Sequence, residues 1–161
     1  MSSFKTWVLT HKKSAVISFL VVPLTLSLWL NFGLEYRVLF NMTNSLPHTL
    51  YLTHPPQAVL KRGDYVAFTH DASPYMIVKR VVGIEGDTIQ HTTCGVQLNQ
   101  LCLELKERRS NGATLTPMKA QTIPKGMLFV AGDHADSFDS RYEEFGLISI
   151  LKIKGQVWPV F

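Results

Sequence analysis

The chain has 161 residues, 46% of them hydrophobic, and a formal net charge of +4. A length of this order accommodates one domain with an appendage. Lysine and arginine are scattered along the sequence and form no basic stripe or arm, which argues against a nucleic-acid-binding protein, so we expect no nucleic acid among its partners.

The first long feature is an uncharged, apolar stretch from Ser14 to Leu34, which follows a basic segment at residues 1–13. As a helix with a rise of about 1.5 Å per residue it would be roughly 31 Å long, close to the ~30 Å hydrocarbon core of a bilayer. A buried helix of a soluble protein would have a polar face, and this stretch has none. We therefore predict a transmembrane anchor at residues 14–35, surrounded by membrane lipid.

The anchor is expected to remain part of the protein. Its apolar run exceeds the core of about 7–15 residues that is usual for a signal peptide, and no pair of small side chains follows it at the spacing of a cleavage site. Lysines of the preceding segment outnumber the basic residues just behind the span, where only Arg37 lies close. This bias predicts a cytoplasmic tail at residues 1–13 and an exported domain at residues 36–161.

Ser45 is the first candidate for chemistry in the exported part. Pro47 fixes the chain after it and disfavours the α region for Leu46, so the local sequence predicts a rigid turn. Such a turn can hold a nucleophile, but the same pattern is also that of an ordinary surface turn.

Short runs rich in β-branched and aromatic residues follow, each bounded by turn-forming residues. This pattern is typical of strands, and no long stretch combines a helical period with good capping. We expect a mainly β domain of mostly antiparallel strands, with orthogonal or barrel-like packing. The predicted strands are Asp64–Thr69, Tyr75–Gly83, Met127–Ala131 and Leu147–Leu151.

Lys79 lies in the second of these runs among apolar neighbours. Strand alternation places it on the same face as Ile77 and Val81. Burial disfavours the charged form of a lysine and lowers its pKa, so that it can act as a general base toward a serine. The alternative is an edge strand with a solvated lysine, which is the commoner state, and only a nearby partner favours the catalytic interpretation.

The cysteines of the chain, Cys94 and Cys102, both lie in the exported part, at a spacing that fits no zinc pattern. In an oxidising compartment we expect them to form a disulfide that closes a short hairpin, with two free thiols as the alternative. The polar segment from Glu104 to Thr122 contains the turn signal Asn111-Gly112. We predict that it forms a hairpin or loop outside the core.

A block dense in turn formers and carboxylates runs from Gly132 to Tyr142. A calcium loop needs a different spacing of oxygen ligands and a closing glutamate, so we predict no metal here. A triad of Ser45, His134 and an aspartate is conceivable, but the chain lacks a Gly-x-Ser-x-Gly elbow. The simplest interpretation is a structural turn with an ion pair between Asp139 and Arg141.

Taken together, these blocks resemble the type I signal peptidase family, and most closely its conjugative-transfer branch, the TraF-type pilin-processing peptidases. The Ser-Leu-Pro turn lacks the extra residue of housekeeping signal peptidases, which favours that branch. The chain departs from the branch at Thr49, where glycine is usual, and at Glu143-Glu144, which are inserted before Phe145. The matching blocks, in their expected order, are residues 41–51, Gly63–Val66, Lys79–Asp87 and Ile123–Tyr142.

The resemblance implies a serine endopeptidase without a cofactor, built as a signal-peptidase-like antiparallel β domain with one N-terminal transmembrane helix. Ser45 would attack the scissile carbonyl and a neutral Lys79 would take its proton. The backbone amide of Ser45 and the hydroxyl of Thr43 would form the oxyanion hole. The residues that would brace the strand of Lys79 are Asp133, Asp139 and Arg141.

By the same resemblance the substrate is an exported pro-pilin, cleaved at the periplasmic face of the bacterial inner membrane, with conjugative type IV secretion components as partners. For a pilin, the substrate's own N-terminal amine would attack the acyl-enzyme and give a cyclic product. One alternative is a general type I signal peptidase that removes signal peptides from exported pre-proteins. The other is an inactive, membrane-anchored assembly protein of a secretion machine.

Overall fold

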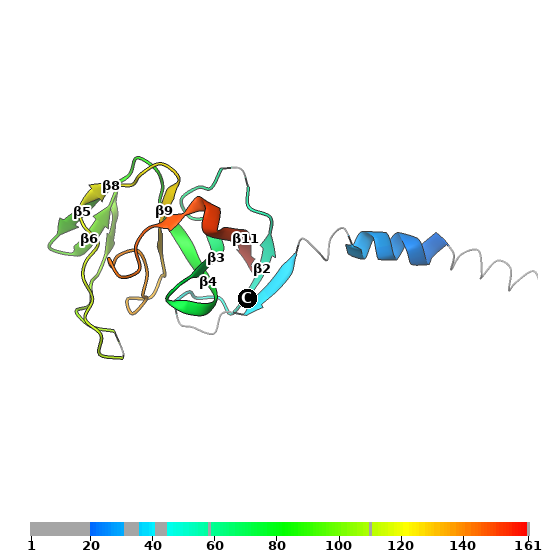
Figure 1. The fold of residues 1–161 in the computed structure, drawn as a ribbon, viewed down its shortest axis with the longest axis horizontal. Helices are drawn as coiled ribbons and strands as arrows, with labels where there is room; N and C mark the ends of the chain where they lie inside the picture. Colours follow the sequence, from blue (N-terminus) through cyan, green and yellow to red (C-terminus); the bar gives the residue numbers. More distant parts are fainter. Residues whose placement is uncertain (1–19, 31–35, 41–44, 58, 110, 161) are drawn as a thin grey trace, which may run out of the picture. The chain divides into compact units, whose positions relative to one another are not determined.

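The computed structural model describes residues 20–30, 36–40, 45–57, 59–109 and 111–160 (Figure 1). The chain divides into two compact units, Met1–Arg37 and Val38–Phe161. In the first unit, residues 20–30 are helical, and the apolar side chains of this helix are exposed, as at Leu24 and Trp29. No helix in the described ranges is long and apolar enough to cross a bilayer. The rest of the predicted anchor and the basic tail lie outside these ranges.

The second unit is built from strands, as the sequence predicted, and they form two sheets. The larger sheet has seven strands in the order β1-β2-β11-β3-β4-β9-β10, and the pairs from β2 to β10 are antiparallel. Its strands are β1 (Arg37–Phe40), β2 (Leu50–His54), β3 (Tyr65–His70), β4 (Ser73–Gly83), β9 (Met127–Ala131), β10 (Ile148–Ser149) and β11 (Ile153–Pro159).

The chain segment between β4 and β9 forms a smaller sheet with the order β7-β6-β5-β8. Its strands are antiparallel to their neighbours. Figure 1 shows this sheet beside the end of the larger sheet that contains β9. The strands are β5 (Thr88–Thr92), β6 (Gly95–Leu98), β7 (Leu101–Leu103) and β8 (Gln121–Thr122).

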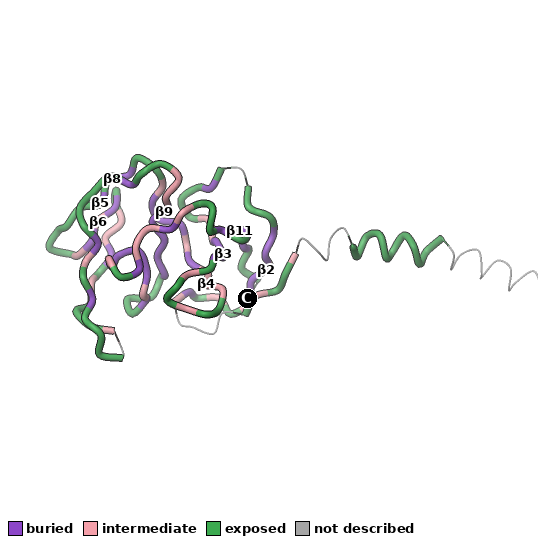
Figure 2. Tube along the Cα trace, in the orientation of Figure 1, coloured by how far each residue is buried: buried purple, intermediate pink, exposed green. Residues whose placement is uncertain are grey.

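Apolar side chains of both sheets form the core, and Figure 2 shows the buried segments running through the interior of both. One cluster lies within the larger sheet and includes Phe68, Val81 and Val130. A second cluster joins the two sheets, because Phe129 of β9 packs with Leu98 of β6. This packing therefore fixes the positions of β4 and β9 and of the residues that they carry.

One part of the strand prediction was wrong. The run Leu147–Leu151 is not one strand: β10 is short and a 3₁₀ turn, Ile150–Lys152, follows it. The side chain of Ser149 accepts the amide of Leu151 and caps that turn, which leaves Leu151 91% exposed. Local capping by a serine has outweighed β propensity here.

The polar segment Glu104–Thr122 does form a hairpin at its tip, where Arg108 is bridged to Thr114. It does not stay outside the core, however. The side chains of Leu115 and Met118 are buried, and Met118 belongs to the cluster that joins the sheets. These apolar residues, spaced within a polar run, return the segment to the core before β8.

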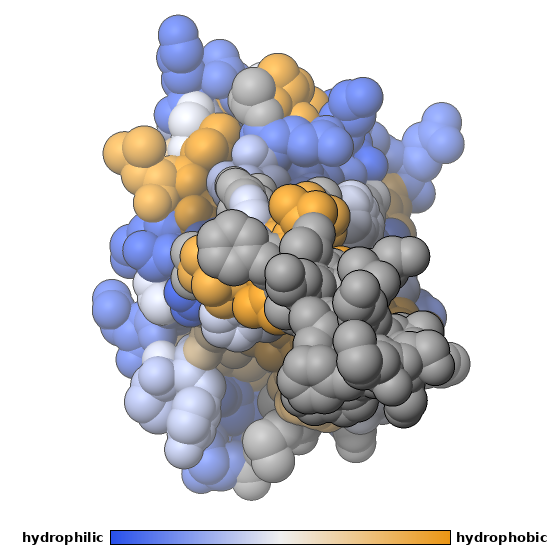
Figure 3. Space-filling view, turned by 90° about the vertical axis from the view of Figure 1, so that its right-hand side faces the viewer, coloured by the Kyte–Doolittle hydropathy of each residue, from blue (hydrophilic) through white to orange (hydrophobic). Residues whose placement is uncertain are grey.

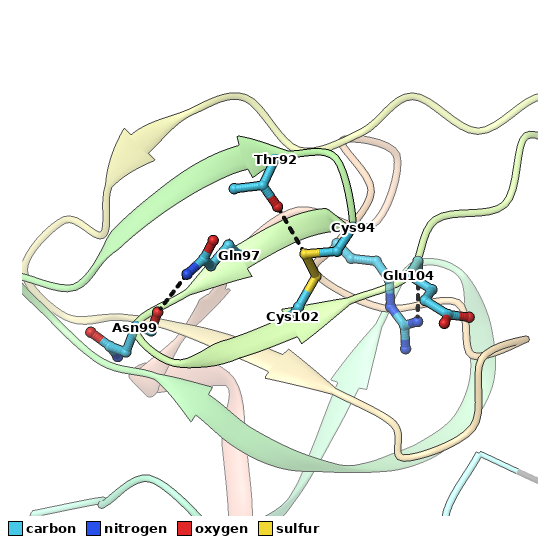
Figure 4. Close-up of a disulfide and its surroundings, with 7 residues drawn as sticks. Thr92, Cys94, Gln97, Asn99, Cys102 and Glu104 are labelled. Carbon is cyan, nitrogen blue, oxygen red and sulfur yellow. Dashed lines mark hydrogen bonds between the residues drawn. A yellow bond between two sulfur atoms is a disulfide. The ribbon is translucent and has the colours of Figure 1, made fainter.

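The predicted disulfide joins Cys94, in the turn between β5 and β6, to Cys102 in β7 (Figure 4). Thr92 lies on the other side of Cys94, with its hydroxyl 2.8 Å from the sulfur. The bond therefore links neighbouring segments of the small sheet, as the hairpin prediction required.

Candidate active site

Lys79 is the buried cation around which the site is built. It lies on β4, paired with Val66 of β3, and it is only 3% exposed. Its Nζ donates a hydrogen bond of 2.6 Å to Oγ of Ser137. Burial lowers the pKa of Lys79 from 10.5 to about 8, although the carboxylate of Asp139 acts in the opposite direction. With this pKa, about one tenth of the lysine is neutral at pH 7.

Ser137, the hydrogen-bond partner of Lys79, is a residue to which the sequence pointed only as part of a motif. It lies in the loop after β9 and is 3% exposed. Ser137 and the carbonyl of Ser45 both lie close to the backbone of residue 132. Glycine is required there, since a Cβ would collide with the side chain of Ser137 and with that carbonyl. Nothing in the sequence distinguishes Ser137 from Ser140, whose hydroxyl bonds only to backbone.

Ser45 occupies the predicted turn, and the loop after β9 holds that turn in place. The carbonyl of Ser45 accepts the amides of Asp133 at 2.8 Å and His134 at 3.3 Å. Its neighbour Leu46 is buried against Ala67 in a third apolar cluster. Thr43, the other predicted contributor to the oxyanion hole, lies outside the described residues.

Ser45 and Lys79 line the same pocket, which has a volume of about 520 Å³. Much of its wall is the first half of β4, with further apolar side chains from other segments. Along this half, from Ser73 to Lys79, the strand pairs with β3 on one side. Pairing with β9 on the other side begins only at Arg80, so no described strand covers the edge that faces the pocket. The apolar contributors outside β4 are Leu39, Phe40, Ala72, Phe138 and Phe145.

Asp139 and Arg141 form an ion pair below the site, and both are almost completely buried. The guanidinium of Arg141 donates to both carboxylate oxygens of Asp139, each at 2.9 Å. Asp139 also accepts the amide of Gly132 at 2.8 Å. The remaining donors of Arg141 bond to the carbonyls of Glu104, Gly132, His134 and Ala135.

Asp133 forms an ion pair with Arg80, the residue after Lys79, at the surface of the site. The three predicted supporting residues thus lie around Lys79, whereas the disulfide is on the small sheet. His134 is not arranged as the base of a triad, because its Nδ1 accepts the amide of Asp136 at 3.1 Å and its side chain is 52% exposed. This geometry favours the serine–lysine hypothesis over the serine–histidine one.

The inserted residues Glu143 and Glu144 bind the polar segment instead of lining the pocket. The amide of Glu143 donates to the carbonyl of Thr116, and the amide of Thr116 donates to the carboxylate of Glu144. Lys119 adds an ion pair to Glu143 at 3.4 Å. The inserted residues Glu143 and Glu144 therefore attach the hairpin segment to the loop that carries Ser137.

Fold and site together define a mainly β protein with a buried lysine of lowered pKa at the end of an uncovered strand edge, where it bonds to Ser137 and lines the same pocket as Ser45. The family model described as signal peptidase, peptidase S26, matches residues 10–161, and the chain belongs to this family. The family-level prediction from the motifs is thereby confirmed.

Several relatives carry the name signal peptidase I. Signal peptidase I T of Bacillus subtilis (strain 168) is 36% identical over 114 residues, which cover 63% of this chain and 57% of that protein. Signal peptidase I of Bacillus amyloliquefaciens is 34% identical over the same length, with the same shares. The chain thus spans somewhat more than half the length of these relatives. The crystal structure of a signal peptidase I from Enterococcus faecalis V583 matches with a TM-score of 0.41 and 25% identity, over 61% of this chain and 96% of that one.

Proposed function

We propose that the protein is a serine endopeptidase with Ser45 as nucleophile and Lys79 as general base. The observation that carries this proposal is the burial of Lys79, with a pKa of about 8, in the pocket that Ser45 also lines. Neutral Nζ takes the proton of the Ser45 hydroxyl as the oxygen attacks the scissile carbonyl, and then gives it to the leaving amine. Water, deprotonated by the same Nζ, releases the acyl group. Ser137 orients Nζ through its hydrogen bond.

The oxyanion that forms on the carbonyl needs donors held in place beforehand. We assign the backbone amide of Ser45 and the hydroxyl of Thr43 to this role. The bonds from Asp133 and His134 to the Ser45 carbonyl support the assignment, because they fix the turn that carries the amide. Asp139 and Arg141 act indirectly, by holding the loop that contains Ser137.

An extended peptide fits the uncovered edge of β4. A peptide that adds to a sheet edge gains main-chain hydrogen bonds, while neighbouring pockets receive alternate side chains. The edge ends at Lys79, so a bound strand would bring one of its carbonyls to Ser45. The apolar wall of the pocket suits small or apolar side chains at the residues before the cleaved bond.

We propose further that the substrate is an exported precursor presented at the bacterial inner membrane, where residues 14–35 anchor the enzyme with its catalytic domain in the periplasm. The apolar side chains of the helix at residues 20–30 support this placement. Apolar groups are visible among the hydrophilic ones in Figure 3. Large apolar residues exposed on the second unit include Phe40, Tyr75 and Trp158.

The Ser-Leu-Pro motif supports a narrower proposal, in which the precursor is a pro-pilin and the enzyme works with conjugative type IV secretion components. The names of the relatives favour a general signal peptidase instead. A Ser45→Ala strain distinguishes the two: lost pilus assembly with normal secretion supports the pilin substrate, and a general secretion defect supports the general signal peptidase.

Mass spectrometry of mature pilin then tests cyclisation, since a product one water heavier than the cyclic form contradicts it. Failure of the purified wild-type protein to cleave either substrate would support the inactive assembly protein.

The lowered pKa of Lys79 predicts the pH profile of cleavage. With a pKa of about 8, the neutral base accounts for about one tenth of the molecules at pH 7 and about nine tenths at pH 9. The value of kcat/KM for a peptide substrate should therefore rise about tenfold over this range and level off above it. A profile that is flat between pH 7 and 9, measured with a substrate that has no titrating group there, contradicts the role of Lys79.

A further inference from the structure

The tip of the hairpin segment places a cation in the same pocket as Ser45 and Lys79. Arg109 lines that pocket, and its guanidinium carbon lies 3.9 Å from the centroid of the Phe138 ring. Its backbone is fixed from both directions, because its amide donates to Ala113 and its carbonyl accepts from Gly112, each at 2.9 Å. The hairpin, which lies far from the catalytic residues in the sequence, thus contributes a charge to the groove.

No protein carboxylate neutralises this charge within the described residues. Asp136 lines the same pocket, and its carboxylate forms an ion pair with Lys106. Glu144 uses both carboxylate oxygens to accept the amide of Thr116. The guanidinium of Arg109 stacks on the face of Phe138, an arrangement that leaves its edge, with the N–H groups, available for a planar partner.

The platform under Arg109 is itself fixed by packing. The Phe138 ring meets Phe145 edge to face, with centroids 5.3 Å apart, and stacks on Tyr142 at 6.2 Å. The N–H groups of an arginine whose backbone and ring contact are both fixed lose less conformational entropy when they bind a ligand. The apolar groups around it, such as Ile77, lower the local dielectric and strengthen its attraction for an anion.

We propose that Arg109 determines specificity by binding a carboxylate of the substrate, from an aspartate or glutamate close to the cleaved bond. The guanidinium presents paired donors that match a carboxylate bidentately. This inference rests on the proposed function, because it assumes that the pocket binds the peptide to be cleaved. It gives the otherwise apolar groove a charge preference that the serine–lysine chemistry itself does not require.

The test uses the full chain in detergent and peptide pairs that differ only by glutamate or glutamine, with the substitution scanned over the residues around the cleavage site. At one position the wild-type protein should prefer glutamate by about three- to tenfold in kcat/KM. Arg109→Gln should abolish the preference, and Arg109→Lys should retain part of it. Arg109→Glu should prefer a lysine at the same position. Arg108→Gln is the matched control, since Arg108 is the neighbouring arginine but does not line the pocket, and it should retain the preference.

Binding of the same peptides to a Ser45→Ala protein provides a readout that does not depend on catalysis. Tighter binding of the glutamate peptide that is lost in the Ser45→Ala, Arg109→Gln protein supports the role of Arg109. This holds even if the wild-type protein cleaves neither peptide, because absence of cleavage would overturn only the proposed function. Cleavage without any charge preference, or a preference that persists in Arg109→Gln, overturns the inference and leaves the proposed function intact. Thermal melting of each variant verifies that it is folded.

Discussion

Lys79→Met is expected to reduce cleavage by about 10⁴-fold or more, because it removes the base that activates Ser45. Among the described residues that line the pocket, the carboxylate of Asp136 could also accept a proton, but it is paired with Lys106. Methionine has a similar length and prefers an apolar environment, so it should fill the same space. A single-turnover assay with a peptide substrate measures the effect on the chemical step. Lys125→Met, at an exposed turn, is the control and should cleave normally.

The same substitution should leave the protein at least as stable at pH 7, because it removes a cation that burial disfavours. How the free energy of unfolding changes with pH follows from the pKa values of Lys79 in the folded and unfolded states. The pKa of Lys79 is about 8 in the folded protein and 10.5 when unperturbed, so between these values the unfolded chain binds more protons. The free energy of unfolding of the wild-type protein should therefore rise from pH 8 to pH 10.5, relative to that of the variant. Urea unfolding at several pH values tests this, and a variant that unfolds more easily at pH 7 contradicts it.

The sequence was sufficient for the strand class of the domain, for the runs that form β3, β4 and β9, and for the face of β4 that carries Lys79. Alternation is a local property, and the structure indeed packs Ile77 and Val81 into one cluster. The end of the β10 run was mispredicted because a single hydroxyl, that of Ser149, decided the local conformation. Burial of Met118 was missed because hydropathy averaged over a polar segment conceals one apolar residue with a defined partner.

The site shows a different limit. The motif order selected Ser45 and Lys79 together, although they are far apart in the chain. Composition could not show that Ser137, and not Ser140, is the partner of Lys79, since the choice depends on how the loop after β9 folds over Gly132. The contribution of Arg109 was equally hidden, because it depends on the return of the hairpin to the groove. Contacts of this kind are set by tertiary packing and leave no periodic pattern.

Arg141→Met should destabilise the fold strongly, by about 3–5 kcal/mol, because it leaves the carboxylate of Asp139 buried without its cation. Arg141 and Asp139 are 2% and 0% exposed, so water cannot replace the lost partner. The substitution also removes the donors that hold the loop around Gly132. Since that loop places Ser137 against Lys79, cleavage should decline even under conditions in which the variant remains folded.

Urea unfolding measures the loss, with Arg62→Met as the matched control. Arg62 also pairs with a carboxylate, that of Asp87, but its own side chain is 51% exposed, so its loss should cost clearly less than the loss of Arg141. Adding Asp139→Asn to Arg141→Met should recover part of the stability, because the amide carries no charge to be left unpaired. Equal losses for the Arg62 and Arg141 variants would contradict the structural role of the buried pair. Cleavage by a folded Arg141→Met protein at the wild-type rate would show instead that the loop is held correctly without it.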